Sequence, residues 1–223
     1  LIEHGTMSFE QVVTPALEYA RDGIAVGPKL AMTMAAFAED ADEWPTRTEA
    51  YATEGKFPGL GERLQQPALA RTFERLIEVE KKNTSLGREQ AIQAARDFFY
   101  KGEIAEEIVS FVKEGGGFLS MSDMADFSVG HEAPETGTFN EYEVYTNGPW
   151  CQGPAFAETV QLLAGDDLKK MGHNTADYIH LVAEALKLSF SDRDAFYGDP
   201  DFIDVPMQGL LSADYTKARR MDI

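Results

Sequence analysis

The sequence contains few of the residues from which disulfides and metal sites are built. It has one cysteine, Cys151, and four histidines among 223 residues. A single cysteine excludes a disulfide within the chain. The histidines, His4, His131, His173 and His180, include no pair at the four-residue spacing that places two zinc ligands on one helical face. We therefore expect no metal site, and the cysteine count leaves the compartment open, since a reduced cytosol and a disulfide-free periplasm fit equally well.

Basic side chains and long apolar runs are also scarce. The chain has 20 Lys and Arg and 38 Asp and Glu, which gives a formal charge of −18. Such a charge repels nucleic-acid phosphates and anionic lipid surfaces. No apolar run approaches the roughly 18 residues that span a bilayer, and residues 1–5 have neither a basic segment nor an initiating Met. We expect no nucleic-acid and no membrane partner, and we expect the chain to be part of a longer protein.

The first part of the chain has the pattern of consecutive helices. Ser8 and Gln11 can form a capping box in front of an amphipathic run that Gly23 ends. The other helices that we expect run from residue 29 to about 43 with Pro45 closing it, from Pro67, from a cap at Ser85 to Tyr100, over 104–112, and as a single turn capped by Ser122 or Asp123.

The periodicity changes near residue 127. Alternating β-branched and aromatic residues predict strands over 127–129 and 138–146, the second with Tyr142 and Val144 on one face and Phe139 and Tyr145 on the other. A loop marked by glycine and proline, 147–154, leads into another helix.

The longest helix is expected to follow a cap at Asn174 or Thr175 and to end near Gly198. Its predicted inward stripe is Ile179, Val182, Ala183, Leu186 and Phe190, and a last helix should start after Ser212. The fold class is α+β and rich in helix. Residues 1–126 form a mainly helical region, and residues 127–223 form a strand-loop-helix region of the same domain.

Three groups of residues resemble catalytic or metal sites without completing one. Cys151 in its turn could be a nucleophile with a histidine base, but a free cysteine is more often a small buried apolar residue. Asp192 and Asp194 diverge by about 200° on a helix, so we expect ion pairs there, with Arg193 bridging to neighbouring acids. The segment 199–201 lacks the further oxygen ligands of a calcium loop, and turn capping explains its aspartates. The residues alone specify no reaction.

Several longer strings carry a family resemblance. They are HGTMSFEQVVTPALEYARDG at 4–23, FYKGEIA at 99–105, GGFLSMSD at 116–123, YEVY at 142–145, EALKLSFSDR at 184–193 and YGDPDF at 197–202. Together and in this order, they resemble the large subunit of the gamma-glutamyltranspeptidase family.

The resemblance implies an N-terminal nucleophile (Ntn) hydrolase. Such a precursor cuts itself into a large and a small chain that share a four-layer αββα sandwich, and it needs no metal or organic cofactor. The Thr that opens the small chain attacks a gamma-glutamyl amide, and water or an amino acid resolves the acyl-enzyme. The partners implied are the small catalytic subunit and a gamma-glutamyl compound or another amide. This chain has no Thr-Thr pair, and the arginine that grips the substrate carboxylate is expected before residue 1, so we expect the chain alone to be inactive.

The loop after the second strand departs from the family pattern. Known members have a proline run followed by Ser-Ser-Gly-Gly, whereas residues 148–154 read GPWCQGP. Trp150 and Gln152 are candidates for lining the substrate cleft, and the alternative is a loop that only connects strand to helix. The departure leaves open a cephalosporin-acylase-like amidohydrolase on the same fold, or a non-catalytic acidic interaction module. The resemblance leaves the compartment open too, since members are often periplasmic or secreted.

Overall fold

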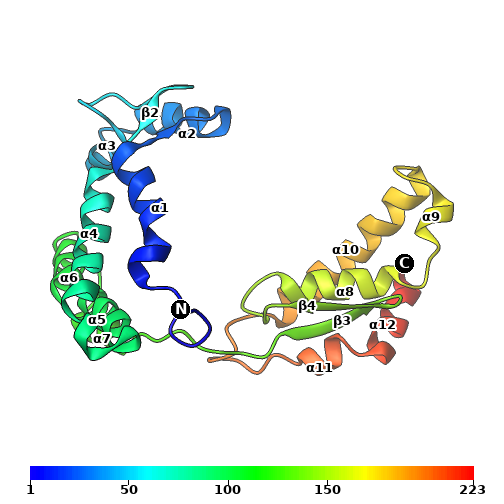
Figure 1. The fold of residues 1–223 in the computed structure, drawn as a ribbon. Coiled ribbons are helices and arrows are strands. Elements are labelled where there is room, and N and C mark those ends of the chain that lie inside the picture. Colours follow the sequence, from blue (N-terminus) through cyan, green and yellow to red (C-terminus); the bar gives the residue numbers. More distant parts are fainter. The chain divides into compact units, whose positions relative to one another are not determined.

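The computed structural model describes residues 1–223, which form two compact units, Leu1–Ser128 and Val129–Ile223 (Figure 1). Each unit has its own secondary structure and its own buried residues. None of the helices combines the length and the apolar character that a membrane span needs.

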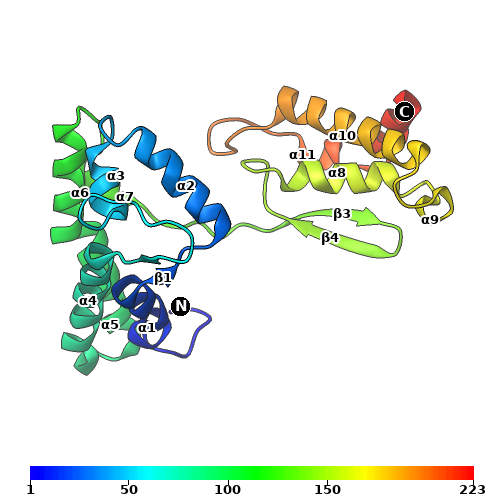
Figure 2. The ribbon, with the colours of Figure 1, turned by 90° about the horizontal axis from the view of Figure 1, so that it is seen from above.

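The first unit is a set of helices in which α1, α4, α5 and α6 pack as successive neighbours. Helix α1 packs on α4, α4 on α5, and α5 on α6, while a short antiparallel pair of strands joins the loops beside α1. Figure 2 shows α4 and α5 side by side. The elements are α1 (Phe9–Asp22), β1 (Ile24–Ala25), α2 (Pro28–Glu39), α3 (Pro45–Tyr51), β2 (Arg63–Leu64), α4 (Pro67–Lys82), a 3₁₀ turn (Thr84–Leu86), α5 (Arg88–Lys101), α6 (Glu103–Glu114) and α7 (Met121–Asp126).

Local capping explains how α1 begins and ends. Ser8 and Gln11 form the predicted capping box, and Gly23, with φ of 84°, ends the helix. The buried carboxylate of Glu80 on α4 accepts hydrogen bonds from the backbone N–H groups of Phe9 and Glu10, at 2.6 and 2.8 Å. A negative charge at a helix N-terminus is stabilising, so this contact fastens α1 to α4.

Four boundaries in this part of the chain differ from the sequence predictions. Helix α2 ends at Glu39, and Pro45 opens α3 instead of only closing α2. Gly87, not Ser85, precedes α5, because residues 84–86 form a 3₁₀ turn. Ser120 caps α7 through Asp123, so the predicted caps Ser122 and Asp123 are wrong. Residues 127–129 form no strand.

The second unit begins with a hairpin. Strands β3 (Glu135–Phe139) and β4 (Tyr142–Thr146) pair antiparallel, with Phe139 opposite Tyr142. The predicted single strand over 138–146 is therefore wrong, because Asn140 takes a φ of 53° and turns the chain. Paired residues share a face, so Phe139 lies on the same side as Tyr142 and not with Tyr145.

Helices cover one face of the hairpin. Gly137 lies against α8, where an added Cβ would approach Ala157 Cβ to 3.0 Å, and a small core joins α8 to α10 through Leu162, Leu163, Leu181 and Ala185. The elements are α8 (Gly153–Leu163), α9 (Leu168–Met171), α10 (Ala176–Phe196), α11 (Met207–Leu210), α12 (Ala213–Arg219) and a 3₁₀ turn (Arg220–Asp222). Thr175 caps α10 and Ser212 caps α12, as predicted.

The predicted inward stripe of α10 is wrong except at Val182, which is partly buried and packs against the core. Ile179, Leu186 and Phe190 are 54%, 40% and 42% exposed, whereas Leu181, Ala185, Ser189 and Asp192 are buried. Small residues at 185 and 189 let α8 approach closely, and this close packing decides which face turns inward. Ile179, Leu186 and Phe190 therefore remain on the surface of the unit.

Candidate functional site

The loop between β4 and α8 is a tight turn. The backbone N–H of Cys151 donates to the carbonyl of Gly148 at 3.1 Å, and α8 begins at Gly153 with Pro154 in its first turn. A Cβ on Gly153 would lie 2.0 Å from Asn147 Oδ1 and 2.7 Å from Thr146 Cβ. Only glycine fits there, so the loop has a defined shape.

The two side chains proposed from the sequence point to different partners. Trp150 Nε1 donates to Glu132 Oε1 at 2.7 Å, and the ring is 55% exposed. Gln152 Oε1 accepts from Arg193 Nη1 on α10 at 3.1 Å. The structure does not bring Trp150 and Gln152 together, and their role toward a substrate stays a prediction.

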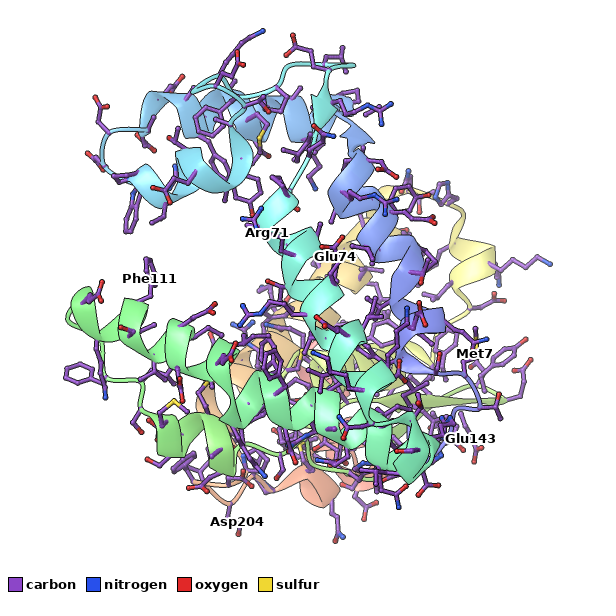
Figure 3. All side chains as sticks on the ribbon, turned by 60° about the vertical axis from the view of Figure 1, so that its left-hand side comes forward. Met7, Arg71, Glu74, Phe111, Glu143 and Asp204 are labelled. Carbon is purple, nitrogen blue, oxygen red and sulfur yellow. The ribbon has the colours of Figure 1, made fainter.

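A cleft of about 880 Å³ lies beside this loop, within the second unit. Gly148 and Pro149 line it from the loop, and residues 202–209, with Asp204 labelled in Figure 3, line another part of it. Neither Trp150 nor Gln152 lines it. The lining residues are Glu132, Ala133, Glu135, Gly148, Pro149, Pro200, Phe202, Ile203, Asp204, Val205, Pro206, Met207, Gln208 and Gly209. The wall thus combines carboxylates with apolar side chains and contains no Lys or Arg.

A buried polar cluster joins three helices of the second unit. Asp192 on α10 is 4% exposed and binds Arg219 of α12 through two contacts, Nη2 to Oδ1 at 2.8 Å and Nε to Oδ2 at 3.2 Å. The Tyr215 hydroxyl donates to Asp192 Oδ2 at 2.9 Å. Burial and the Asp192 carboxylate raise the pKa of Tyr215 to about 12, so the phenol remains a donor at neutral pH.

Glu158 on α8 is the unusual member of this cluster. It is 1% exposed, and no N–H or O–H group donates to either of its carboxyl oxygens. Burial and the facing Asp192 raise the pKa of Glu158 to about 8, which Arg219 only partly offsets. The Glu158 carboxyl is therefore mainly protonated at pH 7.

The other sequence candidates have mixed outcomes. Asp192 forms the predicted ion pair, but with Arg219, while Arg193 pairs with its neighbour Asp194 at 2.6 Å. Asp199 Oδ1 accepts from the N–H of Asp201 at 2.9 Å, which confirms turn capping. Cys151 is exposed, so the expectation of a buried apolar cysteine is wrong, because the tight turn places it at the surface.

Glu158, Tyr215 and Arg219 are not among the candidates that the sequence predicts. Their partners lie 23 to 61 positions apart in the chain, so no local spacing joins them. One signal was available, because Glu158 is the one charged residue of α8.

Comparison with known proteins identifies the family. The model of the gamma-glutamyltranspeptidase family matches residues 1–223. The chain belongs to this family. It is 31% identical to the glutathione hydrolase proenzyme of Escherichia coli over 98% of its own length and 35% of the relative's. It is 30% identical to the glutathione hydrolase-like YwrD proenzyme of Bacillus subtilis over 97% of the chain and 38% of the relative. The chain thus spans about a third of the length of the curated relatives it matches.

Solved structures of gamma-glutamyltranspeptidase-like proteins share the fold. The Helicobacter pylori gamma-glutamyltranspeptidase matches with a TM-score of 0.84 and 25% identity, over 99% of this chain and 60% of that one. A cephalosporin acylase from Bacillus halodurans matches with a TM-score of 0.84 and 26% identity, over 99% of this chain and 39% of that one. These likenesses confirm the predicted α+β, helix-rich fold class of an Ntn hydrolase.

Proposed function

We propose that this chain is the large-subunit part of a gamma-glutamyltransferase or glutathione hydrolase-like enzyme. The enzyme cleaves gamma-glutamyl amides through an acyl-enzyme on the N-terminal Thr of a small subunit. The match of the family model over residues 1–223 carries the proposal. Relatives described as glutathione hydrolase proenzymes support it.

In this proposal the chain supplies scaffold and cleft rather than the nucleophile. It contains no Thr-Thr pair of the kind that opens the small subunit. The loop at 147–154 and the acidic cleft beside it are the parts that we assign to the surroundings of the substrate, with Trp150 and Gln152 as candidate contacts.

The surface of the second unit supports a small-subunit partner. The sheet of β3 and β4 has only two strands, so each strand keeps one edge without a ladder partner. Tyr142 and Tyr145 are more than half exposed, and Ile179, Leu186 and Phe190 form an exposed apolar face on α10. Unpaired strand edges and large apolar faces are typical of surfaces that another chain covers. We assign the small subunit to them.

The test uses the full-length protein. Its intact mass after expression should correspond to two chains, and it should release nitroaniline from gamma-glutamyl-p-nitroanilide. Replacing the new N-terminal Thr by Ala should abolish turnover, while residues 1–223 alone should release no nitroaniline above background. An unprocessed and inactive full-length protein would instead favour the non-catalytic interaction module.

A second candidate is an amide acylase on the same fold. It is favoured by the loop GPWCQGP at 148–154 and by the likeness to acylases, including 28% identity to the Acylase ACY 1 proenzyme of Pseudomonas. The ratio of kcat/KM for gamma-glutamyl-p-nitroanilide and for an N-acyl cephalosporin separates the two. A preference of more than tenfold for the cephalosporin would replace the first proposal by the second.

A further inference from the structure

The buried carboxyl groups of Glu158 and Asp192 lie where three helices meet. Glu158 belongs to α8, Asp192 to α10, and the groups that bind Asp192 from the other side, Tyr215 and Arg219, belong to α12. Both residues are at most 4% exposed, so water cannot solvate two negative charges there.

One guanidinium faces both acids. With both carboxyls ionised, the triad of Glu158, Asp192 and Arg219 would carry a net charge of −1 in a buried site. With one proton on Glu158 the triad is neutral, and the Glu158 O–H can donate to the Asp192 carboxylate, the group that faces it. That hydrogen bond gives Glu158 the partner that no other group provides.

The remaining groups around Glu158 cannot replace this proton. The Tyr197 hydroxyl is buried without a hydrogen-bond partner, and burial together with Glu158, Asp192 and Glu135 raises the pKa of Tyr197. Tyr197 and Tyr215 thus stay neutral at ordinary pH, and Arg219 stays charged. Glu158 is the group whose charge changes near neutral pH.

The attachment of α12 depends on this cluster more than the attachment of α10 does. Helices α8 and α10 are also joined by their apolar core and by the buried bond from Thr159 Oγ1 to Ser189 Oγ at 2.9 Å. Helix α12 is held by Tyr215 and Arg219, and at its end by Arg220, which pairs with Asp166 at 2.8 Å. Gln161 Nε2 on α8 donates to the carbonyl of Leu211, just before α12, at 3.1 Å.

We propose that Glu158 and Asp192 share one proton, and that this proton fastens α12, and with it the neighbouring cleft wall of Met207 to Gly209, to α8 and α10. The device is a proton latch that weakens as the pH rises. Glu158 binds its proton up to about pH 8 while α12 is docked. Burial is the largest cause of this raised pKa, so water that reaches Glu158 when α12 moves away lowers the pKa, although Asp192 stays beside Glu158 and the pKa-lowering Arg219 leaves. Undocking therefore releases part of a proton below about pH 8, and it becomes easier as the pH rises toward that value.

Hydrogen exchange of the 223-residue chain tests the latch. After correction for intrinsic exchange, the protection of amides at 213–219 should fall by up to about tenfold per pH unit from pH 5.5 to 8 and level off above pH 8. Glu158→Gln keeps the shape and the neutral charge of the protonated carboxyl. In this variant the protection of amides 213–219 should therefore stay nearly constant from pH 5.5 to 8. The matched control is Glu143→Gln, which removes an exposed carboxyl on β4 of the same unit (Figure 3) and should keep the pH dependence.

The proposal is overturned if the protection of amides 213–219 falls equally with pH in the Glu158→Gln chain and in the unaltered chain. It is also overturned if this protection does not depend on pH in the unaltered chain. A second measurement does not depend on the variant folding. Infrared spectra with isotope-labelled Glu side chains should show a protonated carboxyl band at pH 7 that disappears above about pH 8. Absence of that band at pH 7 also overturns it.

Discussion

Removing Arg219 should destabilise the second unit far more than removing a surface cation does. In Arg219→Met the aliphatic stem is kept, but both contacts to Asp192 are lost and a carboxylate remains in a site that is 4% exposed. Breaking a buried pair by deleting one partner costs about 3–5 kcal/mol. Tyr215 still donates to Asp192, and the Arg219 side chain is 22% exposed, so we expect the lower end of that range, about 3 kcal/mol.

Urea unfolding followed by tryptophan fluorescence measures this loss. The reference protein and every variant carry Trp44→Phe, so that Trp150 is the remaining tryptophan and reports on the second unit. With an m-value of about 1–2 kcal/mol/M, the midpoint should fall by roughly 1.5–3 M. The control is Lys187→Met, which removes an exposed partner of Glu184 on α10 and should cost less than about 0.5 kcal/mol. A midpoint for Arg219→Met that matches the control would refute the view that Asp192 needs its cation.

Three further predictions concern the loop at 147–154. Gly153→Ala should lower the urea midpoint followed by Trp150 fluorescence by an amount that corresponds to about 2 kcal/mol or more, because the added Cβ would overlap Asn147. An unchanged midpoint would mean that the loop adjusts freely. In the full-length protein, Cys151→Ser should keep turnover of gamma-glutamyl-p-nitroanilide within roughly an order of magnitude, and a loss to background in a folded variant would make Cys151 the nucleophile. Trp150→Phe removes the N–H that binds Glu132; if the ring contacts substrate, KM should change several-fold with kcat nearly constant, and unaltered kinetics would leave the loop as a connection.

Most of what short-range chemistry decides could be predicted from the sequence, with the caps at Ser85 and at Ser122 or Asp123 as the exceptions. The capping box of Ser8 and Gln11, the caps at Thr175 and Ser212, and the stop at Gly23 depend on neighbours within four residues, and all are confirmed. The hairpin was read as one strand because residues 140–141, Asn-Glu, are a weaker turn signal than Asn-Gly. Once Asn140 turns the chain, the alternation restarts and Phe139 changes its face.

The inward face of α10 and the buried cluster could not be predicted from periodicity. Hydrophobicity alone selects Ile179, Leu186 and Phe190, but contact with α8 selects Ala185 and Ser189, and that contact involves residues about 30 positions away. Trp150 and Gln152 were chosen because the loop departs from the family pattern, and the cleft beside them depends on residues 200–209, which no local motif connects to the loop.

The same packing explains why one proton can matter in the second unit. Its apolar core between α8 and α10 is small, and α10 leaves Ile179, Leu186 and Phe190 on the surface. Burial of apolar area contributes roughly 25 cal/mol/Å², so a partner that covers Ile179, Leu186 and Phe190 would stabilise α10. This stabilisation of α10 does not replace the polar contacts of Tyr215 and Arg219, because an apolar surface donates no hydrogen bond to the buried Asp192 carboxylate. Docking of α12 should therefore remain sensitive to the Glu158 proton even when the small subunit is bound.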